Sequence, residues 1–278
     1  MNSAARSVIV HSNGTLDTGP TLWTVAVHEQ VTYSVIRGFR PLLLDLYVPD
    51  DVERPPVVVW IHGGSFHSGD RRWLHRTIPS GSVFTGLVEA GLACASIDYR
   101  LSKEATWPAQ LEDAAAAVEF LRLHADEYGL DAGRLGVWGD SAGGLLAFTT
   151  AFTRTDVRAV AAWYPITDIL DMESTEGELP YSPWLGGWPS EIPDRRAQAS
   201  PITYAHPAVP PCLLVHGEQD TLVPARQSRR LHTRMTENGA DVMYRSVPGA
   251  EHGFEGYPDV AELVTETIEF LRMRLTAV

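Results

Sequence analysis

The hydrophobic residues of this sequence fall into short apolar runs that alternate with longer stretches of helical spacing. The run at 57–61 is continuous and rich in valine, which is typical of a strand buried on both faces. Residues 42–48 alternate leucine or valine with more polar positions, as expected of a half-buried strand near a sheet edge. Similar runs predict further strands at 92–97, 135–138, 157–163, 212–215 and 242–247.

Stretches with apolar residues at helical spacing separate these predicted strands. The clearest begins at Pro108, a residue suited to a first helical turn, and continues with Leu111, Ala114, Val118 and Leu121. Further helices are predicted over 141–152, 224–238 and 258–274. This alternation specifies an open, mostly parallel α/β sheet with helices on both faces, in which a functional site lies at the carboxyl ends of the strands.

Two segments interrupt the alternation. Residues 1–40 predict an N-terminal extension with a short edge hairpin. Residues from about 168 to 207 are dense in Pro, Gly and Trp and are too long for a plain connection, so we expect a small cap or lid insertion. The length and the lack of internal repeats fit a single domain over 1–278.

Composition and charge narrow the range of partners. The chain has 22 Lys and Arg against 35 Asp and Glu, a net charge of −13, and its basic residues occur in pairs rather than clusters, so neither nucleic acid nor a membrane surface is expected as a partner. No run approaches 18 apolar residues and no signal peptide is evident, which predicts a cytoplasmic protein. Cys94 and Cys212 lie in apolar runs and are expected to be buried, reduced thiols.

A Gly-x-Ser-x-Gly motif occupies residues 139–143, directly after the predicted strand at 135–138 and before a predicted helix. A serine on such a sharp turn presents its hydroxyl above the sheet. Small neighbours are needed there because larger side chains would clash with the adjacent strand and helix. The motif and its context predict Ser141 as a nucleophile.

A serine hydroxyl needs a base, and the base needs an acid that orients it. In this fold the expected chain order is serine, acid, histidine. Asp220 and His252 follow two successive predicted strands, where carboxyl-end loops would place them. We therefore predict Asp220 as the acid and His252 as the base, with Glu218 as the alternative acid and His216 as a weaker alternative base.

Donors for an oxyanion are expected after the strand at 57–61, where a His-Gly-Gly turn begins. The backbone N–H groups of this turn can point into the site beside the N–H of Ala142, the residue after the predicted nucleophile. A Gly-Gly pair also occurs in plain tight turns, but this one follows the strand at which the chemistry requires it.

Together these motifs resemble the α/β-hydrolase superfamily, in particular the HGG-motif esterases similar to hormone-sensitive-lipase-like carboxylesterases and the bacterial acyl and carbohydrate esterases. The segments that carry the resemblance are 44–49, 62–64, 98–102, 108–113, 139–144, 200–204 and 216–220. The resemblance implies the same roles for Ser141, Asp220 and His252. Within these segments we expect Asp98 and Arg100 to form a structural ion pair.

The resemblance also implies that Gly64, Ser65 and Ala142 donate to the oxyanion. Ser65 stands where lipase-like members often carry a third glycine. Whether Gly63 or Ser65 supplies the second N–H of the turn therefore stays open.

Aromatic residues on or near the insertion and the predicted site are candidates for the pocket wall, because ligand pockets are largely apolar. They are Phe66, Trp163, Tyr164, Trp184, Trp188 and Phe254. His62, His67 and His75 share no spacing typical of metal ligands, so neither a metal nor another cofactor is expected.

The sequence thus predicts a cofactor-independent serine hydrolase that cleaves short-chain carboxylic esters of small molecules through an acyl-enzyme. An arylformamidase or other amide hydrolase and a sugar-acyl esterase share the same triad and remain alternatives. A non-catalytic α/β-hydrolase that only binds a ligand is the alternative from another class. The sequence indicates neither the physiological ester nor the oligomeric state.

Overall fold

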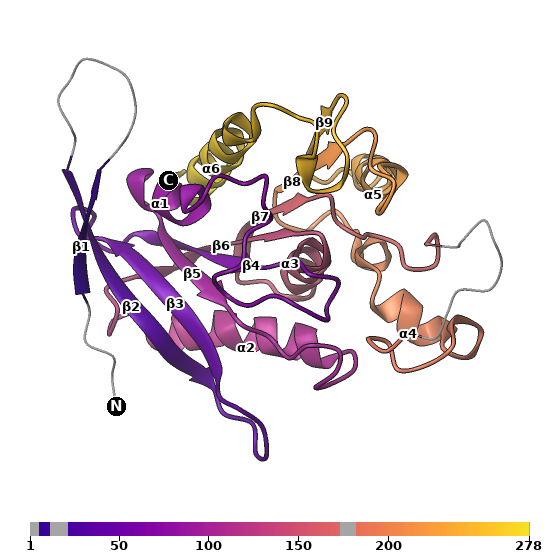
Figure 1. Ribbon diagram of the computed structural model, residues 1–278, viewed down its shortest axis with the longest axis horizontal. Coiled ribbons are helices and arrows are strands. Elements are labelled where there is room, and N and C mark those ends of the chain that lie inside the picture. Colours follow the sequence, from indigo (N-terminus) through magenta and orange to yellow (C-terminus); the bar gives the residue numbers. More distant parts are fainter. Residues whose placement is uncertain (1–5, 12–21, 173–181, 278) are drawn as a thin grey trace.

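The computed structural model describes residues 6–11, 22–172 and 182–277, and these residues form a nine-stranded sheet (Figure 1). The strand order is β1-β2-β3-β5-β4-β6-β7-β8-β9. The strands are β1 (Arg6–His11), β2 (Leu22–Ser34), β3 (Leu42–Pro49), β4 (Pro56–Ile61), β5 (Ala93–Ile97), β6 (Asp131–Asp140), β7 (Val157–Trp163), β8 (Cys212–Gly217) and β9 (Val242–Val247). All seven strands predicted from residue 42 onward are present.

The sheet is parallel from β5 to β9 and antiparallel over β1, β2 and β3. All residues of β4 and β5 are buried, as their apolar runs predict for strands covered on both faces. The N-terminal edge of the sheet is longer than the predicted short hairpin, because β2 has 13 residues. Strand β2 pairs with β1 along one part and with β3 along most of its length. Its pairing with β3 is irregular between His28 and Val31.

Helices cover both faces of the sheet (Figure 1). One face packs against α1 (Ser82–Glu89) and α6 (Val260–Thr276), and the other against α2 (Ala109–Leu123), α3 (Ala142–Thr153) and α5 (Arg226–Glu237). Helix α1 was not predicted from the sequence, because a helix of eight residues contains too few turns for a periodicity to stand out.

The described part of the predicted insertion contains only short helices: η1 (Pro189–Glu191), α4 (Pro193–Gln198) and η2 (Pro201–Tyr204). Residues 173–181 of the insertion lie outside the described residues. Segment η2 contacts α3 and α5, and the buried guanidinium of Arg196 donates a hydrogen bond to the Ile169 carbonyl oxygen at 3.0 Å. The contacts of η2 hold the insertion against α3 and α5, whereas the bond from Arg196 to Ile169 joins two parts of the insertion.

Cys94 and Cys212 are free and buried, as predicted. Burial raises the pKa of both thiols, so they are retained in the protonated, unreactive form. In the described part of the chain, no helix has the length and apolar character needed to cross a membrane.

Candidate active site

Ser141 lies on the sharp turn between β6 and α3, with backbone angles φ 52° and ψ −115°. Two glycines allow this turn. A Cβ atom on Gly139 would lie 2.3 Å from the carbonyl oxygen of Gly143, and one on Gly143 would lie 2.0 Å from the carbonyl oxygen of Ile61. The small residues of the motif are therefore required by the close packing of α3 against β4 and β6, as the sequence predicts.

Ser141, His252 and Asp220 form a continuous series of hydrogen bonds. The Ser141 Oγ atom lies 3.0 Å from His252 Nε2, and His252 Nδ1 lies 2.7 Å from Asp220 Oδ2. Ser141 follows β6 and Asp220 follows β8, while His252 opens the short helix η3 (His252–Phe254) after β9. Three loops at the carboxyl ends of parallel strands thus bring together the three side chains predicted from the sequence.

The carboxyl group of Asp220 is surrounded by donors. Its Oδ1 atom accepts the backbone N–H groups of Leu222 at 3.0 Å and Val223 at 2.7 Å. Burial alone would raise the pKa of Asp220, but hydrogen bonds from His216 and His252 outweigh it and hold the pKa at about 2. The ionised carboxylate orients the imidazole of His252 so that Nε2 faces the serine hydroxyl.

The alternative acid and base occupy other positions. His216 is fully buried; its Nδ1 atom lies 2.7 Å from Ser228 Oγ and its Nε2 atom 3.2 Å from Asp220 Oδ2. The same Nε2 atom also donates to the carbonyl oxygen of Val223 at 2.8 Å, so His216 contacts Asp220 but not Ser141. Glu218 is exposed, and its carboxylate accepts a hydrogen bond from Ser246 Oγ at 2.8 Å.

The turn after β4 has an unusual backbone. Gly64 has φ +100°, and a Cβ atom there would lie 2.2 Å from the carbonyl oxygen of Ser68. Ser65 and Phe66 also have positive φ, 54° and 63°. The carbonyl oxygen of Gly64 accepts the N–H groups of His67 and Ser68, which fixes the turn with its bend towards the serine loop.

Asp140, the residue before Ser141, is fully buried beneath this turn. Its carboxyl group accepts the hydroxyl of Tyr164 at 3.3 Å and lies close to Gly63, where a Cβ atom would come within 3.0 Å of Oδ2. Burial raises the pKa of Asp140 to about 7, although the backbone of Gly63, the nearby His252 and the hydroxyl of Tyr164 act in the opposite direction. Gly63 is therefore packed closely against the carboxyl group of Asp140.

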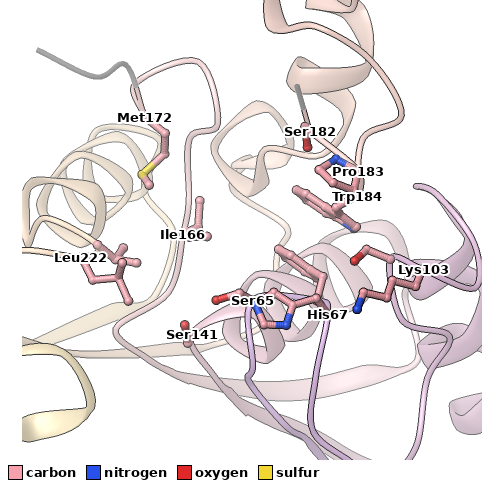
Figure 2. A pocket seen from close by; sticks show the side chains of 13 residues that line it. Ser65, His67, Lys103, Ser141, Ile166, Met172, Ser182, Pro183, Trp184 and Leu222 are labelled. Atoms are coloured by element: carbon pink, nitrogen blue, oxygen red, sulfur yellow. The ribbon is translucent and has the colours of Figure 1, made fainter. Parts of the chain in front are cut away.

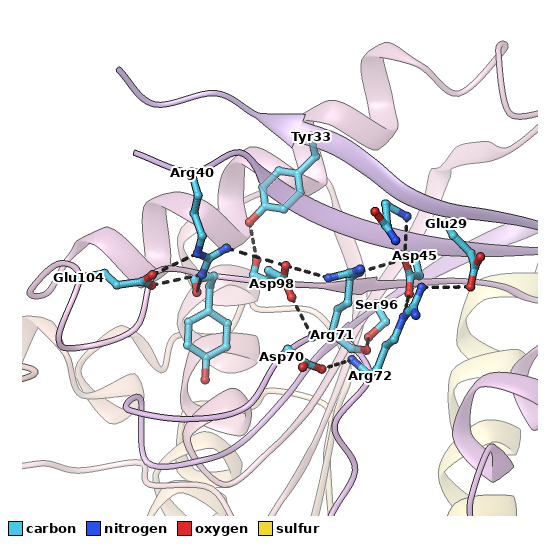
Figure 3. Close-up of polar contacts among 12 residues, drawn as sticks. Glu29, Tyr33, Arg40, Asp45, Asp70, Arg71, Arg72, Ser96, Asp98 and Glu104 are labelled. Carbon is cyan, nitrogen blue, oxygen red and sulfur yellow. Dashed lines mark hydrogen bonds and ion pairs between the residues drawn. The ribbon is translucent and has the colours of Figure 1, made fainter. Parts of the chain in front are cut away.

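A polar cluster fastens the segment after the turn to the sheet edge (Figure 3). The guanidinium of Arg71 bridges Asp45 at 2.9 Å and Asp98 at 3.0 Å, and Arg72 Nε lies 2.5 Å from the second carboxylate oxygen of Asp45. Burial acts to raise the pKa of Asp45, but its hydrogen bonds to both arginines keep it below the ordinary value. The cluster joins residues 71–72 to β3 and to the end of β5.

The predicted ion pair between Asp98 and Arg100 is wrong. Asp98 pairs with Arg71 and, at 3.8 Å, with Arg40. Arg100 instead binds Asp113 of α2, through its guanidinium at 2.7 Å and through its backbone N–H at 2.8 Å. The two residues follow β5 directly, and each faces a different element of the structure.

A cleft of about 600 Å³ opens beside Ser141 (Figure 2). Its lining residues within the described part of the chain are Ser65, Phe66, His67, Ser102, Lys103, Ser141, Ile166, Met172, Ser182, Pro183, Trp184, Leu222 and Val223. Figure 2 shows Ser65, His67 and Lys103 on one side and Ile166, Met172 and Leu222 on the other. The side with Lys103 also carries Pro183 and Trp184, so it combines polar and apolar groups, whereas Ile166, Met172 and Leu222 make the opposite side apolar.

Of the six aromatic residues predicted to wall a pocket, Phe66 and Trp184 line this cleft, with parallel rings 3.7 Å apart between centroids. Trp163 and Phe254 do not line it, because both are fully buried on the face covered by α1 and α6. The indole of Trp163 donates to Thr267 of α6 at 3.0 Å.

Tyr164 and Trp188 also fall outside the lining. Tyr164 is buried and packs edge-on against the ring of His252 at 4.7 Å, so it supports the histidine. Trp188 is 47% exposed at the surface of the insertion. Sequence reasoning missed most of the lining residues, above all Lys103, Ile166, Met172 and Leu222; they come from separate loops and carry no common sequence signal.

The three histidines weighed as metal ligands occupy different environments. His62 is buried against the ring of Tyr99 and its Nδ1 donates to the Gly63 carbonyl oxygen, His67 lines the cleft, and His75 hydrogen-bonds Thr77. Among the described residues, no group of three or more His, Cys, Asp or Glu side chains is placed to hold a metal ion.

Solved structures place this arrangement in a known class. The truncated form of a carbohydrate esterase from gut microbiota has a TM-score of 0.78 and 26% identity, over 90% of this chain and 96% of the other. A bacterial heroin esterase has a TM-score of 0.75 and 27% identity, over 91% of this chain and 85% of the other. The fold is therefore the α/β-hydrolase fold, as the sequence resemblance implies.

The chain belongs to the BD-FAE family, whose sequence profile matches residues 44–235. Esterase LipQ of Mycobacterium tuberculosis is 30% identical over 240 residues, which are 78% of this chain and 55% of LipQ, so the chain spans little more than half of that relative. The acetyl esterase of Salmonella schwarzengrund is 27% identical over 258 residues, 86% of this chain and 77% of that enzyme.

Proposed function

We propose that this protein is a serine carboxylesterase that hydrolyses short-chain carboxylic esters of small molecules through an acyl-enzyme. The observation that carries the proposal is the hydrogen-bonded series from Ser141 through His252 to Asp220, open to a cleft on the serine side. The esterase names of the relatives and of the structural neighbours support the same reaction class.

In the first half-reaction, Ser141 Oγ attacks the ester carbonyl carbon while its proton passes to His252 Nε2. The carbonyl π bond opens and leaves a negative charge on the former carbonyl oxygen. When the tetrahedral intermediate collapses, the bond to the alcohol breaks, and the alcohol leaves with the proton from His252. Asp220 remains ionised and stabilises the transient imidazolium.

The second half-reaction releases the acyl group. A water molecule gives a proton to His252 and adds to the acyl carbon, and a second oxyanion forms. Its collapse breaks the bond to Ser141 Oγ, which regains the proton from His252. The products are the carboxylic acid and the free enzyme, and no cofactor is needed for the balance of atoms or electrons.

We assign the oxyanion donors to the backbone N–H groups of Gly64, Ser65 and Ala142. Ala142 follows the nucleophile at the start of α3, and the left-handed turn at Gly64 and Ser65 borders the same cleft. Ser65 lines the cleft whereas Gly63 is packed against the carboxyl group of Asp140, and this favours Ser65 over Gly63. Such preorganised donors stabilise the charge that develops in the transition state.

We further propose that the whole chain, 1–278, acts as one catalytic domain and that the segment from about 168 to 207 is its cap. Trp184 and Met172 of this segment line the cleft, and the short helix η2 of the segment contacts α3 and α5. These contacts support the assignment of the segment as one boundary of the substrate cleft.

The decisive experiment compares wild type with Ser141→Ala on p-nitrophenyl acetate, aryl formamides and acetylated sugars, which also separates the reaction classes. We expect kcat to fall by at least about 10³-fold in the variant with its circular dichroism spectrum unchanged. Ser102→Ala, a second serine of the cleft, is the matched control and should retain activity. Labelling of a different serine by a fluorophosphonate, or an active Ser141→Ala variant, would overturn the proposal.

A further inference from the structure

Lys103 is the only lysine of the sequence, and it lines the cleft that contains Ser141. It is exposed, and Figure 2 shows its side chain beside that of His67, on the side of the cleft opposite to Ile166 and Leu222. Within the described part of the chain, its ammonium group forms no hydrogen bond or ion pair. A cation that has no partner among the described residues is thus available to a molecule bound in the cleft.

The neighbouring acid does not neutralise this charge. Glu104 directs its carboxylate to Arg40, at 3.0 and 3.2 Å, and accepts the backbone N–H of Leu101 at 2.8 Å. The carboxylate of Glu104 is therefore engaged by Arg40 and by the Leu101 backbone and not by Lys103.

The backbone that carries Lys103 is firmly placed against the oxyanion turn. The N–H of Ser102 donates to the carbonyl oxygen of Phe66 at 2.7 Å. On the other side of Lys103, the carbonyl oxygen of Ala105 accepts the side-chain amide of Gln110 at 2.8 Å. Because the backbone around Lys103 is already fixed, its ammonium group can bind an anionic ligand without a rearrangement of this loop.

We infer that Lys103, with His67 beside it, forms a carboxylate-binding subsite, and that the preferred substrates are esters in which one half carries a carboxylate and the other half is short and apolar. This inference rests on the proposed esterase activity. The apolar half would lie against Ile166 and Leu222 on the opposite wall. In a protein of net charge −13, a local cation is needed to hold an anionic substrate.

The test uses two pairs of esters that differ in a carboxylate. Mono(4-nitrophenyl) glutarate against 4-nitrophenyl pentanoate places the charge on the acyl half, and 3-acetoxybenzoate against 3-methylphenyl acetate places it on the alcohol half. The quantity compared is the ratio of kcat/KM for the anionic ester to that for its neutral partner. The pair whose ratio changes when Lys103 is substituted identifies the half of the ester that binds near Lys103.

In one of the two pairs, Lys103→Met should lower this ratio by about fivefold to tenfold, as expected for loss of a solvent-exposed, charge-assisted contact. Lys103→Arg should retain the ratio. Arg229→Met is the matched control, since it removes one exposed positive charge on α5 outside the cleft, and it should leave the ratio unchanged. Raising the salt concentration should move the wild-type ratio towards that of Lys103→Met.

An unchanged ratio in both pairs, with neutral esters still hydrolysed, would overturn the carboxylate subsite and leave the esterase proposal standing. Failure of wild type to hydrolyse any of the four esters would instead overturn both proposals. A ratio that falls equally in Lys103→Met and Arg229→Met would show a general effect of net charge and would also overturn the subsite.

Discussion

Nε2 of His216 lies 3.2 Å from Oδ2 of Asp220, the same oxygen that lies 2.7 Å from Nδ1 of His252. The carboxylate is thus held between two imidazoles. His216 is fully buried, and its other ring nitrogen is fixed by Ser228 Oγ at 2.7 Å. We interpret His216 as a positioning residue that sets the angle at which Asp220 meets His252.

The first prediction concerns this positioning. In His216→Gln, kcat should fall by about tenfold with KM little changed, because one hydrogen bond to a charged group is lost. Ser228→Ala is the control: it removes the partner of Nδ1 but leaves the contact with Asp220, and should have a smaller effect. Steady-state kinetics combined with thermal unfolding would check this, and an unchanged kcat in folded His216→Gln would contradict it.

The second prediction separates the two candidate acids. Asp220→Asn should lower kcat by roughly 10² to 10⁴-fold, because the amide holds His252 in the wrong tautomer. Glu218→Gln should change kcat by less than about twofold, since its carboxylate is exposed and bound to Ser246. Both variants keep the side-chain volume, so they form a matched pair. A larger loss in Glu218→Gln would mean that Asp220 is not the acid.

The third prediction follows from the buried carboxyl group of Asp140, whose pKa is raised to about 7. An unfolded aspartate ionises near pH 3.9. The higher folded pKa of Asp140 therefore stabilises the folded state fully below about pH 3.9. This stabilisation is lost as the pH rises through about 7. Between pH 4 and pH 8, the free energy of unfolding of wild type should therefore fall relative to that of Asp140→Asn by up to about 4 kcal/mol.

Asp220 provides the opposite control, because its folded pKa of about 2 lies below its unfolded value. Its ionised form stabilises the fold above about pH 4, and that contribution of about 2.6 kcal/mol is lost as the pH falls towards 2. Urea unfolding of wild type, Asp140→Asn and Asp220→Asn over pH 2–8 would measure both effects. A difference between wild type and Asp140→Asn that does not vary with pH would contradict the third prediction.

The strands and the serine turn could be predicted because their signals are local. A continuous apolar run such as 57–61 requires a strand that is covered on both faces. Glycine is required at 139 and 143 because a Cβ atom at either position would lie less than 2.5 Å from a backbone oxygen. Asp220 and His252 could be found because each follows a strand directly, and parallel strands bring their carboxyl ends to one edge of the sheet.

The cleft could not be predicted in the same way. Strand β7 is apolar along almost its whole length, so its sequence does not reveal that Trp163 faces α6 rather than the cleft. Lys103 and Leu222 line opposite sides of one cleft only because two loops that are distant in the sequence lie near each other in the fold. The pairing of Asp98 with Arg71 depends on the same kind of long-range approach.

The last prediction concerns acyl length. The cleft holds about 600 Å³, is bounded by the stacked rings of Phe66 and Trp184, and must also accept the alcohol. Each methylene buried against the apolar wall gains about 0.8 kcal/mol, or roughly fourfold in kcat/KM, until the wall is reached, beyond which a further methylene gains nothing or clashes. With p-nitrophenyl esters we therefore expect a maximum between roughly two and six acyl carbons.

Ile166→Trp should shift this maximum to shorter chains, because the larger ring fills the apolar side of the cleft. Leu123→Trp is the matched control, since Leu123 is 74% exposed at the end of α2 and outside the cleft lining. The described part of the insertion contains no helix longer than the six residues of α4, so no jump in rate is expected at the micelle threshold. Measured rates from C2 to C16 that peak at C10 or beyond, with such a jump, would instead indicate a lipase with a mobile lid.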